Sequence, residues 1–127
     1  MESESKAIPV AAQILQQCVE VQRKKAADYQ NPASTVQQAD YYLSGVKTIY
    51  EIMHAKMLRI KSIMETIESD PSFEPNNEAM FDSFVDLINY TSFGAAYLQG
   101  GIPGQKPDHN MFNRPSVKIK EEPKEDE

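Results

Sequence analysis

The chain has 127 residues, of which 40% are hydrophobic and 25% charged, and its formal net charge is −6. One cysteine and two histidines exclude an internal disulfide and argue against zinc chemistry, and the acidic balance disfavours direct nucleic-acid binding. Because no apolar run is long enough to cross a membrane and the N-terminus, MESESKA, is acidic, the sequence predicts a single soluble domain in the cytoplasm, with no membrane partner.

The first predicted helix runs from about Pro9 to Tyr29. Proline suits the first turn of a helix, and apolar residues recur at helical spacing as far as Val21. Pro32 pushes the residue before it out of helical geometry, so the helix must end there. Residues 1–7 are expected to form a flexible N-terminus.

A second, longer helix is predicted from about Thr35 to Glu68, with Gly45 as a kink or a join. Its apolar stripe includes Ile49, Ile52, Met53, Met57, Ile60, Ile63, Met64 and Ile67. The segment SDPSFEPNN then interrupts the pattern with two prolines.

A third helix is expected to begin at Asn76 or Asn77, one of which would cap it, and to end near Gln99 before two glycines. After Gly101 the chain is rich in proline and charge and has no periodicity, which predicts a flexible, mixed-charge tail over residues 101–127. Since no strand-like alternation persists, we predict an all-α bundle of three to four helices over residues 8–100, with a disordered C-terminal tail.

Lys56 lies within the apolar arc of the second helix, and Arg59 lies at its edge. The lysine could extend its methylenes along apolar surface and place its ammonium in solvent. Alternatively, it could meet a carboxylate on a facing helix or a phosphate in a pocket. The sequence leaves both interpretations open.

The third helix carries a row of oxygen ligands. Glu78, Asp82 and Asp86 are spaced by four, and Asn89 completes the row on the same side of the helix. An ordinary solvated acidic face would look the same, but Asp86 and Asn89 are embedded in the apolar run VDLINY. Carboxylate and amide oxygens are the ligands that Mg²⁺ prefers, so the row is also a candidate metal site.

Two smaller groups accompany this row. Glu51 and His54, at a spacing of three on the second helix, would add ligands from a second element. Lys25, Asp28 and Tyr29 form a polar group at the end of the first helix, where a lysine is also expected from the helix dipole alone.

These motifs, in this order, resemble the phage-borne nucleotide-modification-associated branch of the MazG-like all-α nucleoside triphosphate pyrophosphohydrolases. The resemblance covers about residues 22 to 98 and consists of short motifs whose specificity lies in their order and spacing, although Asp82 and Asp86 are one residue further apart than the corresponding acids of MazG-like enzymes. The motifs are KxxDY with Lys25, Asp28, Tyr29 and the following Pro32, then Gly45 before Lys56 and Arg59, and finally Glu78, Asp82, Asp86, Asn89 and Tyr90.

The resemblance implies a helical bundle that often dimerises and a Mg²⁺-dependent hydrolysis of a nucleoside or deoxynucleoside triphosphate to monophosphate and pyrophosphate. Two departures weaken the implied acid set: His54 stands where an acid is usual, and Ala55 precedes Lys56 where the related branch commonly has an acidic residue. A neutral histidine suits Mn²⁺ better than Mg²⁺.

The resulting hypothesis places Mg²⁺, with Mn²⁺ as the alternative, on acids from two helices. Its metal ligands are Glu51, Glu78, Asp82 and Asp86, its catalytic acids are Glu78, Asp82 and Asp86, and its substrate-binding residues are Lys25, Asp28, Tyr29, Lys56, Arg59 and Asn89. The expected partners are a nucleoside triphosphate and further copies of the chain in a homo-oligomer, in a bacterial host cytoplasm if the protein comes from a phage. The alternative hypothesis is a non-catalytic nucleotide-binding protein or a helical adaptor that dimerises through its apolar stripes.

Overall fold

The structure is a computed structural model, and it describes residues 7–29, 31–70, 72 and 77–116. Over these residues the chain forms three α-helices, α1 (Val10–Tyr29), α2 (Val46–Ser69) and α3 (Asn77–Leu98), and a 3₁₀ helix, η2 (Gln38–Tyr41). The described part contains no strand, so the all-α prediction is confirmed. None of its helices combines the length and the apolarity that crossing a bilayer requires.

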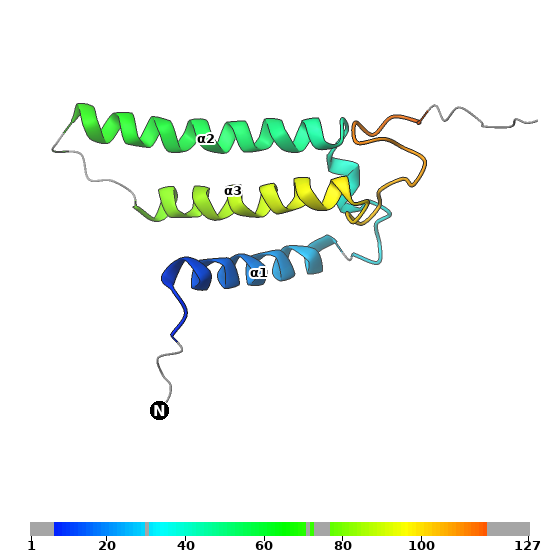
Figure 1. The fold of residues 1–127 in the computed structure, drawn as a ribbon, viewed down its shortest axis with the longest axis horizontal. Helices are drawn as coiled ribbons and strands as arrows, with labels where there is room; N and C mark the ends of the chain where they lie inside the picture. Colours follow the sequence, from blue (N-terminus) through cyan, green and yellow to red (C-terminus); the bar gives the residue numbers. More distant parts are fainter. Residues whose placement is uncertain (1–6, 30, 71, 73–76, 117–127) are drawn as a thin grey trace, which may run out of the picture.

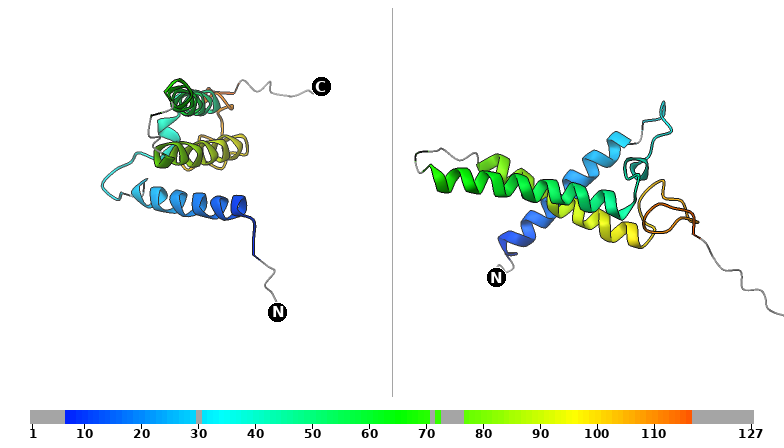
Figure 2. Two further views of the ribbon diagram at one scale, coloured as in Figure 1. Left: turned by 90° about the vertical axis from the view of Figure 1, so that its left-hand side faces the viewer. Right: turned by 90° about the horizontal axis from the view of Figure 1, so that it is seen from above.

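The three helices form three layers. Figure 1 shows α3 between α2 and α1, with α2 and α3 running antiparallel along most of their length. Seen from above in Figure 2, α1 crosses this pair at a steep angle, so its interface with α3 is much shorter than that of α2 with α3. The polar groups carried by α2 and α3 are therefore held side by side along the pair.

The second helix begins later than predicted. The expected start near Thr35 is wrong, because residues 35–37 have no regular structure and the short helix η2 and a turn follow before α2 begins at Val46. Gly45 has a positive φ of 62°, which no continuing helix allows. The first free backbone N–H of α2, at Val46, donates to the carbonyl oxygen of Met111 at 2.8 Å. Gly45 is thus a join rather than a kink.

The buried core lies at the end of the pair where α2 begins and α3 ends. Its most buried cluster is made of Ala39, Tyr42, Ile49, Tyr97 and Ile102. Two of these residues precede α2 and one follows α3, so the segments outside the long helices complete the core. Burial of such side chains contributes about 1.5–3 kcal/mol each.

The segment after α3 needs a correction to its expected boundary. Residues 101–116, which the sequence assigns to a flexible tail, fold back over the end of the pair, and Ile102 is only 5% exposed. Ala39 N–H donates to Pro103 O at 2.9 Å, and Asn113 Nδ2 donates to Leu43 O at 3.2 Å. Turns that are stabilised by contacts distant in sequence have no hydrophobic periodicity, so the sequence pattern does not predict them. The expected tail over 117–127, the N-terminal residues 1–6 and a cap at Asn76 lie outside the described residues.

Candidate functional site

A polar hollow of about 300 Å³ lies between α2 and α3. Both helices contribute to it, because the two run side by side (Figure 1). Its lining residues are Lys56, Arg59, Glu78, Ala79, Asp82, Ser83 and Asp86. Five of the residues that the sequence singled out as candidate site residues therefore meet here, two cations from α2 and three acids from α3.

The centre of this hollow is an ion pair. Lys56 Nζ lies 3.1 Å from Asp86 Oδ2, and the two side chains are 30% and 32% exposed. Of the two interpretations of Lys56, the facing carboxylate is the one observed. An ion pair at this depth is only partly screened by water, so each charge depends on the other.

The acids share one side of α3 but do not converge on a point. Glu78 and Asp82 are exposed, while Asp86 is half-buried. Among the described residues, no group of three or more histidine, cysteine, aspartate or glutamate side chains is arranged to hold a metal ion. Glu51 and His54 are exposed and do not line the hollow. The magnesium site therefore stays a prediction. Glu51, one of its four proposed ligands, does not line the hollow with the other three acids.

Asn89 belongs to a different set of contacts from the rest of the acidic row. It is 4% exposed, and Gln22 Nε2 of α1 donates to its Oδ1 at 2.8 Å and to Ser92 Oγ at 2.9 Å. Sequence reasoning missed Gln22, although a glutamine one residue after Val21 on the apolar side of α1 was the available signal. This hydrogen-bonded group fixes where α1 crosses α3.

A small cavity of about 50 Å³ adjoins this α1–α3 contact. It is lined by Val21, Gln22, Lys25, Asp86, Asn89, Tyr90 and Phe93. Asp86 lines both this cavity and the polar hollow, so the two are neighbours across one carboxylate. Lys25 and Asn89, predicted from separate motifs, are thereby brought to the same place as Asp86.

Tyr90 adds a neutral hydroxyl beside this carboxylate. Burial, and secondly the negative charge of Asp86, raise the pKa of Tyr90 above its usual value of 10.0. The phenol therefore stays protonated at neutral pH and can donate a hydrogen bond. Its ring packs edge-on against Phe93, with ring centroids 5.5 Å apart, which holds it in place.

Of the two other predicted residues at the end of α1, the structure places one away from both spaces. Asp28 is exposed and lines neither the polar hollow nor the small cavity. The side chain of Tyr29 lies outside the described residues. Of the KxxDY motif, only Lys25 is placed next to the other candidates.

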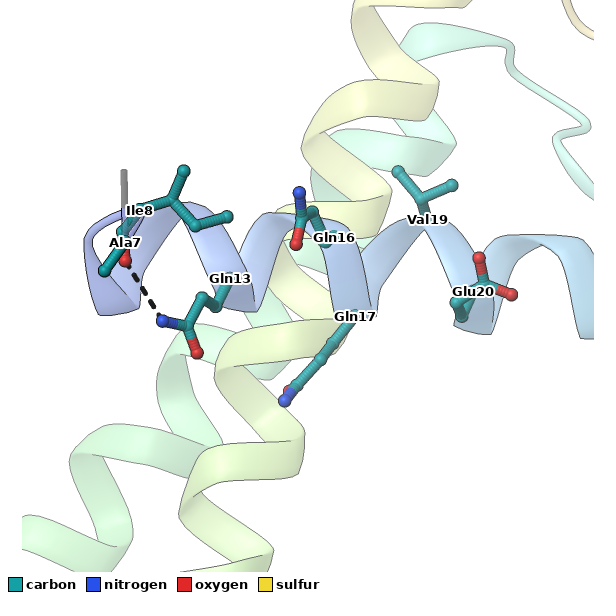
Figure 3. A pocket seen from close by; sticks show the side chains of 7 residues that line it. All are labelled: Ala7, Ile8, Gln13, Gln16, Gln17, Val19 and Glu20. Carbon is teal, nitrogen blue, oxygen red and sulfur yellow. Dashed lines mark hydrogen bonds between the residues drawn. The ribbon is translucent and has the colours of Figure 1, made fainter. Parts of the chain in front are cut away.

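A wider hollow of about 890 Å³ runs along the surface of α1. Figure 3 shows that its lining side chains, Ala7, Ile8, Gln13, Gln16, Gln17, Val19 and Glu20, all come from α1 and the short segment before it. The hydrogen bond drawn there, from Gln13 Nε2 to Ile8 O at 3.0 Å, is local to the helix start. No side chain of a second element closes this surface, so it offers no site comparable to the hollow between α2 and α3.

Comparison with known proteins found no family model that matches the chain and no significant match among curated proteins or solved structures. The function has to be inferred from the arrangement of the chain's own side chains.

Proposed function

We propose that the protein binds a nucleoside triphosphate at the polar hollow between α2 and α3 and hydrolyses it, with Mg²⁺, to a monophosphate and pyrophosphate. The observation that carries this proposal is the meeting of Lys56 and Arg59 with Glu78, Asp82 and Asp86 in one hollow. Its volume, about 300 Å³, is at the lower end of the range of small-molecule sites.

The side chains that line the hollow are of the types that bind phosphate groups and Mg²⁺. Lys56 and Arg59 supply positive charge for phosphate oxygens, and arginine can bind such oxygens in a bidentate manner. Mg²⁺ is usually held in proteins by one or two carboxylates together with waters and substrate phosphates, so it needs no converging cage of acids. Asp82 and Asp86 would hold it, with Glu78 as a third acid. When bound, Mg²⁺ would neutralise charge on the phosphate oxygens.

The position of the small cavity indicates in which direction a bound substrate would extend from the polar hollow. Because Asp86 lines both spaces, a ligand whose phosphates contact Lys56 and Arg59 could extend past Asp86 toward Lys25, Asn89 and Tyr90. The cavity, about 50 Å³, has room for a hydroxyl group of the ligand rather than for a whole sugar or base, and the neutral Tyr90 hydroxyl is suited to bind such a group.

The test is thermal unfolding with Mg²⁺ or Mn²⁺ and a panel of nucleoside and deoxynucleoside triphosphates, with pyrophosphate release measured in the same samples. A ligand at 100 times its Kd stabilises the folded state by about 2.7 kcal/mol, which for a domain of this size raises Tm by about 10 °C. We expect a metal-dependent shift that Arg59→Gln reduces and Lys61→Gln, an exposed control on the same helix, leaves unchanged. A panel that shifts nothing and releases no pyrophosphate would overturn the proposal.

A specific observation favours the second candidate function, a helical protein that self-associates. Tyr50, Met57 and Met64 follow one another at intervals of seven on α2 and are 66%, 58% and 47% exposed. On α3, Phe84 is 47% exposed, and Thr91 Oγ1 contacts Met53 Sδ at 4.0 Å, which places these residues on one side of the pair. By helical spacing this apolar side is turned away from Lys56 and Asp86.

We expect this apolar side to pair with that of a second copy and to give a dimer at micromolar concentration. Met57→Lys should convert the dimer to a monomer, because it places a charge within the contact. Leu58→Lys is the matched control, since Leu58 is 50% exposed but turned about 100° around α2. Light scattering measures the mass, and a wild-type monomer at tens of micromolar would rule the dimer out.

A further inference from the structure

The segment after α3 folds back over the end of the helical pair (Figure 1). A separate polar hollow of about 340 Å³ lies between this segment and the end of α3. It lies about three helical turns along α3 from Asp86 and shares no lining residue with the candidate nucleotide site. Its lining includes Tyr97, Leu98, Lys106, His109, Asn110 and Met111.

The loop that carries these side chains is held by its own hydrogen bonds. Asn110 N–H donates to Arg114 O at 2.8 Å, and Asn113 N–H donates to Asn110 O at 2.9 Å. Asn113 Nδ2 also donates to Leu43 O, which attaches the loop to the segment before α2. The side chains are therefore presented on a fixed frame.

These bonds also determine which atom of His109 is available. The Asn113 amide donates through Nδ2 to Leu43 O, so its Oδ1 must accept from His109 Nδ1, 2.9 Å away. The neutral imidazole then carries its proton on Nδ1, and Nε2 is the free atom. The charged group closest to Nε2 is Asp108 Oδ1, at 3.9 Å, and the Asp108 side chain is 85% exposed.

Two further polar groups that line the hollow, those of Asn110 and Lys106, present donors. Asn110 Oδ1 accepts from Phe112 N–H at 2.9 Å and from Arg114 N–H at 3.2 Å, so the Asn110 amide presents Nδ2 as its unused end. The ammonium of Lys106 forms no ion pair with any residue in the described ranges. An ammonium, an amide N–H and an imidazole thus line one space, and the exposed Asp108 is not among its lining residues.

We propose that this hollow binds the anionic group, carboxylate or phosphate, of a small molecule whose apolar part lies on Leu98 and Met111. The Lys106 ammonium and the Asn110 amide N–H are donors that favour an anion, and Lys106 would add a charge-assisted hydrogen bond. His109 Nε2, an acceptor in the neutral ring, would add a donor only in the protonated ring. Leu98 and Met111 are 61% and 42% exposed, which offers apolar surface beside the donors. Asp108, whose Oδ1 lies 3.9 Å from His109 Nε2, is a nearby negative charge that lowers the affinity for free anions.

The experiment is an NMR titration of the ¹⁵N-labelled full chain with sodium phosphate and, separately, sodium acetate, at constant ionic strength set by sodium chloride. We expect saturable shifts of the Lys106, His109 and Asn110 signals. Saturation by phosphate alone assigns a phosphate ligand, and saturation by acetate alone assigns a carboxylate. Non-saturating shifts with both anions would overturn the proposal.

Three variants sharpen this test. Lys106→Gln should weaken binding at least fivefold, whereas Lys61→Gln should leave it unchanged. Asp108→Asn, which removes the negative charge beside His109 and keeps the size of the side chain, should tighten binding about threefold. Binding that is indifferent to both Lys106→Gln and Asp108→Asn would also overturn the proposal. Shifts at Lys56 and Arg59 report the other hollow separately, so the two proposals can fail independently.

Discussion

Replacing Gly45 with alanine is expected to lower the free energy of unfolding by about 3–5 kcal/mol. Gly45 has a φ of 62°, and a Cβ atom there would overlap the Met111 carbonyl oxygen, a backbone atom that cannot move aside alone. Relief of the overlap would break the 2.8 Å hydrogen bond from Val46 N–H to Met111 O. Denaturant unfolding followed by far-UV circular dichroism measures the loss.

Two other glycines are matched controls for this substitution. Gly100→Ala tests strain alone, because its φ is 72° but nothing lies within 4 Å of the added Cβ, and it should cost about 1–2 kcal/mol. Gly94→Ala lies within α3 with Ile49 Cγ2 at 3.6 Å, an ordinary contact, and should stabilise the protein by about 0.5–1 kcal/mol. Equal losses at Gly45 and Gly100 would show that the contact with Met111 contributes nothing.

The second large effect is expected from the ion pair between Lys56 and Asp86. Under the proposed function, Asp86→Asn should reduce pyrophosphate release about 100-fold or more, because it removes a charged group at the point where both hollows meet. The same change should cost about 1–2 kcal/mol of stability, since it leaves the half-buried Lys56 without its partner. Initial rates and denaturant unfolding measure the two effects separately.

Exchanging the two residues separates structure from chemistry. The double variant Lys56→Asp with Asp86→Lys restores opposite charges across the helices, so stability should recover most of what either single change loses. Turnover should not recover, because the carboxylate has moved to α2 and away from Asp82. If the exchange restored activity together with stability, the pair would be a structural contact and the nucleotide proposal would lose its central residue.

The helix ends that depend on local signals could be predicted from the sequence. The predicted first helix, Pro9 to Tyr29, compares with Val10–Tyr29, and the predicted ends at Glu68 and Gln99 compare with Ser69 and Leu98. Proline and glycine act on their own neighbours, so their effect is visible in the sequence.

The start of α2 could not be predicted in this way. The residues before it contain no strong breaker until Gly45, and what holds them out of a helix is their contact with the segment after α3. Ala39 N–H, for example, donates to Pro103 O. Such long-range backbone bonds have no local signature in either segment.

For the candidate site, residue spacing predicted which side chains share one side of a helix. It did not predict which residues of two helices face each other. The shared side of Glu78, Asp82 and Asp86 follows from helical geometry, and the structure brings all three to one hollow. Periodicity does not specify which turn of one helix faces which turn of another. It could mark Gln22 as a polar residue on the apolar side of α1, but it did not indicate that Asn89 is its partner or that Glu51 lies apart from the acids of α3.

The contact between Met111 and the start of α2 also has a consequence for the order in which the molecule can assemble. The chain is synthesised from its N-terminus, so α2 is complete long before Met111 exists, and during that time its first turn lacks the acceptor that ends up capping it. Contacts between distant parts of a chain form at an entropic cost that is recovered only at closure. The described segment that is synthesised last thus fixes where α2 begins. The end of the helical pair at which α2 begins can reach its native structure only after this loop has been synthesised.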